Sequence, residues 1–198
     1  MKLIILHETD YASTKWAGGT TKQLLLLPPK ATYAKRNFDL RISIASIQIP
    51  ASDFTPLPGI NRNFVLLKGA LLLNINKKGK QLLLPGDVID FKGNNAISCK
   101  GTGSDYNVMT QGNHLVQTQY LSLENKEAAE VEFYPQEQLV FLYLSSGSIE
   151  LIGFGLNQKL VAGMCCYVDQ LDTSSLLKLK AKGPANIVLT EVWMDRKA

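Results

Sequence analysis

The chain has 198 residues, of which 45% are hydrophobic and 19% charged, and its formal net charge is +4. This composition excludes a disordered chain and provides enough apolar material for a packed core. The charge excess is mild and lacks the clustered basic and aromatic residues of a nucleic-acid binder, so we expect no nucleic-acid partner.

The beginning of the chain, MKLIILHE, is too short for the hydrophobic region of a signal peptide. No segment approaches the roughly 20 apolar residues of a membrane span. We therefore expect a cytoplasmic protein with no membrane partner. The three cysteines, Cys99 and the adjacent pair Cys165 and Cys166, lack the spacing of a disulfide framework, which predicts buried, reduced thiols.

The first distinctive segment is WAGGTT, residues 16–21, which is rich in glycine but lacks the spacing of a phosphate-binding loop. Two interpretations stay open at this point. The segment could be a flexible cover that closes over a ligand, with Trp16 as an apolar lid, or it could be a plain glycine turn between two strands.

LRISIASI, residues 40–47, alternates as a strand, with Arg41, Ser43, Ala45 and Ile47 on one face. A guanidinium inside a β-barrel needs an anionic partner, because an unpaired buried charge costs several kcal/mol. The partner could be a carboxylate of the protein, such as Asp105, or a bound anion, and a structural salt bridge is the favoured hypothesis.

Short apolar runs then follow one another, separated by turn residues, and helical periodicity is nearly absent. This pattern predicts strands and is typical of a sandwich or barrel. We expect a solvated hairpin tip at the basic run 77–80, and a surface position for Arg62 at a barrel mouth. The predicted strands cover 40–49, 64–67, 70–75, 81–84, 88–91 and 96–100.

GSDYNVMTQG, residues 103–112, is an unusual strand because both of its faces mix polar and apolar residues. Asp and Asn are poor strand formers, so their place here indicates a role other than packing. Asp105, Asn107 and Met109 would share one face, and we expect that face to line a cavity.

The stretch 115–138 could form one amphipathic helix or an extended bridging strand. Beyond it the second half repeats the plan of the first: 138–153 echoes 63–75, and 159–168 echoes 82–91. The segment 186–193 takes the place of the polar strand. The order of elements predicts two tandem β-barrels, with an N-terminal domain over 1–115 and a C-terminal domain over 116–198.

The sequence contains few motifs that indicate a metal site or a catalytic site. The two histidines, His7 and His114, form no metal-binding arrangement, so we expect no metal and no cofactor. We expect His114 to be a loop histidine. No serine lies in a nucleophile elbow, and no catalytic residue is assigned.

Four segments in order, WAGGTTKQL, LRISIASI, FTPLPGINRNFVLLKG and SDYNVMTQ, resemble motifs of the HutD/Ves family. The resemblance covers residues 10–112 and extends more loosely over the second half. Lys22 and Gln23 replace the Arg and Glu of the family pattern, Gln111 replaces its closing Arg, and an Asn after Trp16 is missing. The matching residues are Trp16, Thr21, Arg41, Ser43, Pro58, Gly59, Arg62, Asp105, Asn107 and Met109.

The resemblance implies an all-β bicupin, with two cupin-like jelly-roll barrels in one chain. Some family members are encoded with histidine-utilisation enzymes, and a role in sensing or buffering a pathway intermediate has been suggested; others are described as stress-induced. No established reaction can be carried over. A homodimer is compatible with a cupin-like barrel.

These observations favour a non-catalytic or regulatory protein that binds a small anionic metabolite in the first barrel, such as urocanate or a formylated glutamate-type carboxylate. Two alternatives stay open: a metal-free cupin-type isomerase or epimerase with Asp105 as general base, and a protein-interaction module. The expected ligand-binding residues are Trp16, Thr21, Arg41, Ser43, Arg62, Asp105, Asn107 and Met109.

Overall fold

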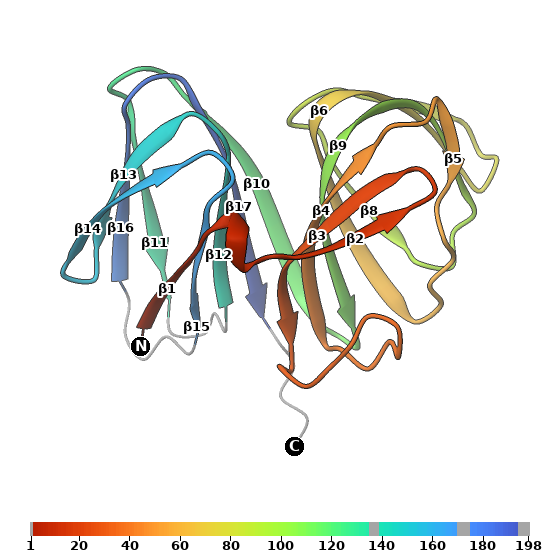
Figure 1. Cartoon of the computed structure of the whole chain (residues 1–198), viewed down its shortest axis with the longest axis horizontal. Coiled ribbons are helices and arrows are strands. Elements are labelled where there is room, and N and C mark those ends of the chain that lie inside the picture. The colour runs from red at the N-terminus through yellow and green to blue at the C-terminus, as the bar shows by residue number, and fades with distance from the viewer. Residues whose placement is uncertain (1, 135–138, 170–174, 194–198) are drawn as a thin grey trace. The chain divides into compact units, whose positions relative to one another are not determined.

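The computed structural model describes residues 2–134, 139–169 and 175–193, and it is all-β (Figure 1). Within these ranges the helical structure is one short 3₁₀ turn, η1 (Glu8–Asp10). No helix in the described part of the chain is long and apolar enough to cross a membrane. The chain divides into two compact units. The N-terminal unit is Tyr11–Gly112, and the C-terminal unit joins the chain from Asn113 onward to the segment that ends at Asp10.

The N-terminal unit is one antiparallel sheet of eight strands. Its path runs β2-β3-β4-β9-β6-β7, while β5 pairs with β9 and β8 pairs with β6. The strands are β2 (Ala12–Trp16), β3 (Gly19–Leu27), β4 (Leu40–Ile47), β5 (Ala51–Asp53), β6 (Ile60–Ile75), β7 (Lys80–Leu83), β8 (Val88–Lys92) and β9 (Ile97–Gln111). Residues 77–79 of the basic run lie in the exposed turn between β6 and β7, as predicted, and Lys80 begins β7.

Strands β6 and β9 are each continuous where the sequence predicts two separate strands, and they run side by side (Figure 1). Glycine makes this continuity possible. Gly69 has a φ of 89°, and a Cβ there would lie 2.1 Å from the carbonyl oxygen of Thr102. A Cβ on Gly101 would lie 2.1 Å from the carbonyl oxygen of Ala70. The two backbones therefore touch where both strands bend, and pairing resumes after a bulge between Leu66 and Lys68.

The C-terminal unit contains two sheets, ordered β1-β15-β12-β17-β10 and β11-β16-β13-β14. The segment after residue 115 is extended, so the strand alternative applies to it and the helix alternative does not; residues 135–138 lie outside the described ranges. The strands are β1 (Lys2–Leu6), β10 (Leu115–Leu123), β11 (Ala128–Phe133), β12 (Leu139–Ser146), β13 (Ser148–Gly153), β14 (Leu156–Val161), β15 (Cys165–Asp169), β16 (Ser175–Ala181) and β17 (Ala185–Trp193).

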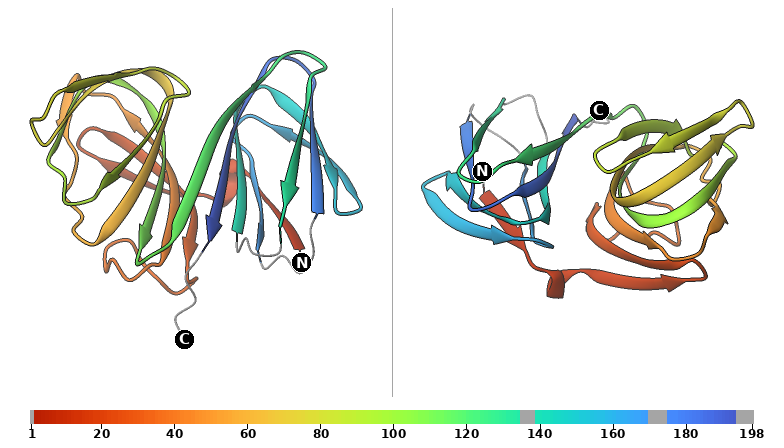
Figure 2. Two further views of the ribbon diagram at one scale, coloured as in Figure 1. Left: turned by 180° about the vertical axis from the view of Figure 1, so that it is seen from behind. Right: turned by 90° about the horizontal axis from the view of Figure 1, so that it is seen from above.

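The first strand of the chain belongs to the C-terminal unit, which the boundary expected near residue 115 did not anticipate (Figure 2). Strand β1 pairs with β15, with Ile5 opposite Cys166. Leu3 and Ile5 pack against the apolar core of this unit. Leu3 and Ile5 lie on the same face of β1 and point toward this core. Strand β1 is therefore the edge strand of a sheet whose other strands come from the second half of the sequence.

The two units share an order of strand pairing. The first half of β6 pairs with β8 and β9, and its second half with β7 and β9. In the C-terminal unit β12 pairs with β15 and β17, while β13 pairs with β14 and β16. The sequence echo of 63–75 thus has a structural counterpart in β12 and β13.

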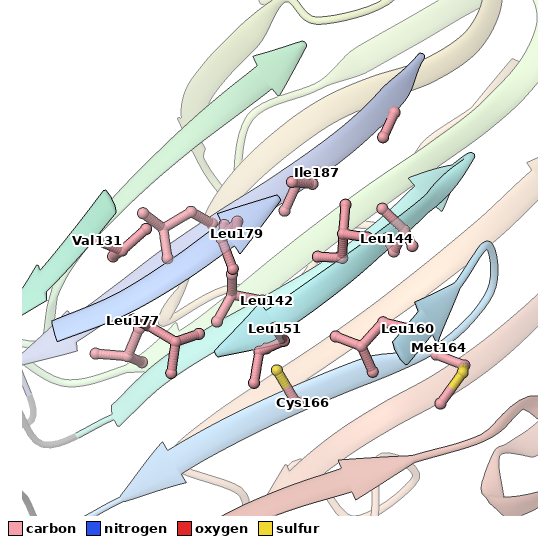
Figure 3. Close-up of a cluster of buried hydrophobic side chains, with 14 of the residues drawn as sticks. Val131, Leu142, Leu144, Leu151, Leu160, Met164, Cys166, Leu177, Leu179 and Ile187 are labelled. Atoms are coloured by element: carbon pink, nitrogen blue, oxygen red, sulfur yellow. The ribbon is translucent and has the colours of Figure 1, made fainter. Parts of the chain in front are cut away.

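The interiors of the two units differ. The C-terminal unit contains a large apolar cluster, in which Leu142, Leu151 and Leu177 pack with Cys166 (Figure 3). All three cysteines are buried thiols, as predicted. Smaller apolar clusters of the N-terminal unit gather around Phe64 and around Phe38.

The bend of β6 gives a first prediction. Gly69→Ala should lower the free energy of unfolding by about 3 kcal/mol, because the new Cβ would meet a backbone oxygen and the positive φ is strained. Gly59→Ala is the matched control, since Gly59 has a φ of 81° but nothing lies within 4 Å of its Cβ position. It should cost only about 1 kcal/mol. Urea denaturation measures both, and equal losses would contradict the close approach.

Candidate functional site

The N-terminal unit encloses a cavity of about 320 Å³. All eight residues expected to bind a ligand line it: Trp16, Thr21, Arg41, Ser43, Arg62, Asp105, Asn107 and Met109. The expectation that one face of the polar strand lines a cavity is thereby met. Whether these residues bind a ligand stays a prediction.

Strand register explains why these side chains meet. Strand β9 lies between β4 and β6, with Arg41 opposite Met109 on one side and Arg62 opposite Met109 on the other. Two residues further along, Ser43 stands opposite Asn107. Since every second residue of a strand points to the same face, the two arginines flank Met109 on the cavity face.

Arg62 is buried, with 9% of its surface exposed, so the expectation of a surface arginine is wrong. Its strand is covered on both sides, by β8 and by β9, and the rings of Phe54 and Phe91 lie 5.1 and 4.9 Å from the guanidinium carbon. Arg62 Nη2 donates a 2.7 Å hydrogen bond to Asn107 Oδ1. Asn107 Nδ2 in turn donates to Asp105 Oδ1. One amide thus bridges a guanidinium and a carboxyl.

Arg41 is buried as well, and it makes no salt bridge with Asp105, contrary to the favoured hypothesis. The reason is register: Asp105 stands opposite Ala45, four residues along β4, and its Oδ1 is taken by Asn107. Arg41 Nε donates to Gln23 Oε1 at 3.3 Å, and Nη1 lies 3.9 Å from Met109 Sδ. Its guanidinium also stacks 4.2 Å from the centre of the Tyr33 ring.

Two buried guanidinium groups share this cavity with one buried carboxyl, that of Asp105. Burial lowers the pKa of both Arg41 and Arg62, yet guanidinium groups remain protonated in proteins. Neither forms an ion pair within the described ranges, and Arg62 Nε is buried with no hydrogen-bond partner there. A guanidinium has more N–H donors than these bonds use. An added acceptor with negative charge would satisfy them.

Asp105 is the opposing charge, and it is only 2% exposed. Burial raises the pKa of its carboxyl from 3.8 to about 7, although the charge of Arg62 and the hydrogen bond from Asn107 act in the opposite direction. Its Oδ2 accepts no hydrogen bond from the described residues. The carboxyl therefore titrates near neutral pH, close to the charge of Arg62.

Trp16 lies at the rim of the cavity, because it lines the cavity and is also 40% exposed. Residues 16–19 form the turn between β2 and β3, so the segment is a glycine hairpin that also brings Trp16 to the cavity. A Cβ on Gly18 would lie 2.0 Å from the Trp16 ring. Glycine at this position therefore lets the indole fold over the turn.

Several lining residues were missed by the sequence analysis, among them Gln23, Tyr33 and Phe54. Gln23 could have been found, because it lies two residues after Thr21 and so shares its face of β3. Tyr33 and Phe54 lie outside the strands, where no periodicity indicates the direction of a side chain. His114 follows β9 and does not line the cavity, in agreement with the expected loop position.

The site offers little metal or thiol chemistry. In the part of the chain that the structure describes, no three residues among His, Cys, Asp and Glu are grouped so that they could hold a metal ion. Burial raises the pKa of the Cys99 thiol to about 11, with a contribution from Asp105, so this thiol stays protonated at neutral pH. The groups that remain for recognition are guanidinium, amide, hydroxyl and carboxyl.

Comparisons with known proteins agree with this architecture. A family model described as HutD matches residues 8–188. A conserved protein of unknown function from Pseudomonas aeruginosa PAO1 superposes with a TM-score of 0.85 at 20% identity, covering 98% of this chain and 100% of the other. HutD from Pseudomonas fluorescens SBW25, in a formate condition, gives 0.77 at 19% identity with the same coverage.

Oxalate decarboxylase from Bacillus subtilis gives a TM-score of 0.70 at 9% identity, covering 98% of this chain and 78% of the other. These likenesses show the fold alone, which is all-β and cupin-like. No curated protein matches the sequence.

The raised pKa of Asp105 gives a second prediction, on stability. Between about pH 4 and pH 7 the unfolded chain loses this proton while the folded chain keeps it, so the group lowers stability as pH rises, by up to about 1.4 kcal/mol per pH unit. Asp105→Asn should remove that slope. Urea denaturation of both proteins across this range measures it, and parallel pH profiles would show that the carboxyl is not perturbed.

Proposed function

The chain belongs to the HutD family, and on that premise we propose that its N-terminal unit binds a small anionic carboxylate metabolite without catalysing a reaction. The observation that carries the proposal is the pair of buried guanidinium groups, which share one cavity and make no ion pair with a described residue. A buried charge without a partner costs several kcal/mol, and a bound anion would offset that cost.

A carboxylate suits these donors better than other small ligands. Arginine binds carboxylates through two parallel hydrogen bonds, and charged hydrogen bonds are stronger than neutral ones. Arg41 is held from one side by the Tyr33 ring and Arg62 by two phenyl rings, which leaves edge donors for a ligand. The aromatic rings also restrict both guanidinium groups, so little entropy is lost on binding.

The remaining lining residues would orient the bound ligand. Asn107, Ser43 and Thr21 provide polar groups on the cavity face, and Trp16 and Tyr33 provide apolar surface near the rim. A volume of about 320 Å³ lies at the small end of ligand pockets, which run from about 300 to 1,000 Å³. Intermediates of histidine degradation, such as urocanate or a formylated glutamate, are the metabolites to test first.

We further propose that the two units are the two cupin-like barrels of a bicupin, on the basis of their shared pairing order. The C-terminal barrel would then be structural. It contains a large apolar cluster, and burial raises the pKa of the Cys166 thiol within it. Such a core lacks the convergent charges of the N-terminal cavity.

A metal-free isomerase or epimerase is the second candidate, and the titration of Asp105 near neutral pH favours it. A general base works best when its pKa lies near the operating pH. Incubation of each candidate carboxylate with the protein in deuterium oxide separates the two functions. Binding alone predicts no deuterium in the recovered compound, whereas an isomerase would incorporate deuterium at the carbon that loses its proton.

The third prediction tests binding directly. Formate, urocanate and N-formylglutamate are titrated into the protein, and dissociation constants are taken from amide chemical shifts. Arg62→Met should weaken the tightest of them at least about tenfold, because a charged hydrogen bond contributes about 1.5–3 kcal/mol. Arg36→Met is the matched control, since Arg36 is exposed and does not line the cavity, and it should bind like the unmodified protein.

Two results would count against the proposal. One is that none of the three compounds shifts any cavity residue at millimolar concentration. The other is that Arg62→Met and Arg36→Met bind equally well while circular dichroism shows both variants folded.

A further inference from the structure

Asp105 is the carboxyl nearest to the proposed anion site. Two described carboxyl groups line the cavity, and Asp105 is buried while Asp53 is exposed. The Asn107 amide connects Asp105 to Arg62, since it accepts from the guanidinium and donates to the carboxyl. An anion that pairs with Arg62 therefore comes to lie beside Asp105.

A second carboxylate that enters this buried site repels the charge of Asp105, because like charges interact strongly at low dielectric. The ligand therefore raises the pKa of Asp105 further and favours its protonated form. The ligand carboxylate is favoured in its charged form by guanidinium donors, whereas Asp105 is held by a neutral amide and lies deeper in the protein. Asp105 is therefore the group that takes the proton.

We propose that a carboxylate binds in this cavity together with one proton, which Asp105 takes up as the ligand pairs with the arginines. This inference rests on the proposed function. The protonated carboxyl then becomes a donor, and its Oδ2, which has no partner within the described ranges, can give an O–H···O bond to the ligand. Protonation thus converts Asp105 from a negative charge that repels the anion into a hydrogen-bond donor to it.

Asp105 is the buried carboxyl among the charged and titratable groups on and near the cavity. Strand β4 contributes Arg41 and β6 contributes Arg62, and both stay charged. The Cys99 thiol in the first half of β9 stays protonated because its pKa is raised to about 11. Asp53 next to the cavity is exposed, and Tyr33 comes from the connection between β3 and β4. Strands β2 and β3 contribute groups that do not titrate, such as Thr21 and Gln23.

A defined pH dependence follows. Below about pH 7 Asp105 already carries its proton, so the affinity should not change with pH while the ligand stays ionised. Above about pH 7 the binding of each carboxylate is coupled to the uptake of one proton by Asp105. The dissociation constant should then rise up to about tenfold per pH unit, until the pH reaches the raised pKa that Asp105 has beside the ligand.

The fourth prediction uses formate as the probe, because it stays ionised over the whole range. Its dissociation constant is measured from amide shifts between pH 6 and pH 9 for the unmodified protein and for two variants. Asp105→Asn keeps a neutral side chain with a donor, so its dissociation constant should not change with pH. Asp53→Asn removes an exposed carboxyl next to the same cavity and should keep the rise above pH 7.

A second readout follows the proton itself. In protein labelled with carbon-13 at aspartate side chains, the Asp105 carboxyl signal should titrate near pH 7 without formate and at higher pH when formate saturates the site. An unchanged titration with saturating formate would overturn the coupling. So would an unmodified protein whose affinity does not change between pH 6 and pH 9.

These outcomes are distinct from a failure of the proposed function. If formate, urocanate and N-formylglutamate all fail to bind at every pH, the binding function itself is wrong. If a carboxylate binds with an affinity that does not depend on pH, the binding function stands and the proton coupling is rejected.

Discussion

The burial of two guanidinium groups without an ion-paired carboxylate is the constraint on which the N-terminal unit depends. Arg41 and Arg62 remain charged, and their described partners are two side-chain amides, a thioether sulfur and aromatic rings. These contacts hold the groups in place but do not neutralise them. The C-terminal unit, built on the same order of pairing, fills its interior with hydrocarbon instead. The contrast shows that the fold does not require charges inside.

Strands β6 and β9, which bend at glycines, position the residues that line the cavity. Each strand continues past a glycine bend and pairs with different neighbours on either side of it. Phe91 from β8 and Phe54 after β5 therefore reach the same guanidinium, although they lie far apart in sequence. Asn107 can then bridge Arg62 and Asp105. The bends of β6 and β9, the contacts of Arg62 and the environment of the Asp105 carboxyl therefore depend on one another.

Much of the site could be predicted from the sequence because strand periodicity is local. The alternation in 40–47 and 103–112 placed Arg41, Ser43, Asp105 and Asn107 on the correct faces. The burial of Arg62 and the absence of an Arg41–Asp105 salt bridge depend on which strands become neighbours and in which register, and that information is not local. The pairing of β1 with β15 and the approach of Tyr33 depend on tertiary contacts in the same way.

The most direct test observes the guanidinium groups themselves. In nitrogen-15 labelled protein, the side-chain Nε–H signals of Arg41 and Arg62 can be followed while formate is added at pH 6. The account predicts that both signals move and saturate together with the amide shifts of the cavity, while the signal of exposed Arg36 stays in place. If the signals of Arg41 and Arg62 stay unchanged at saturating formate, these arginines do not form an anion site.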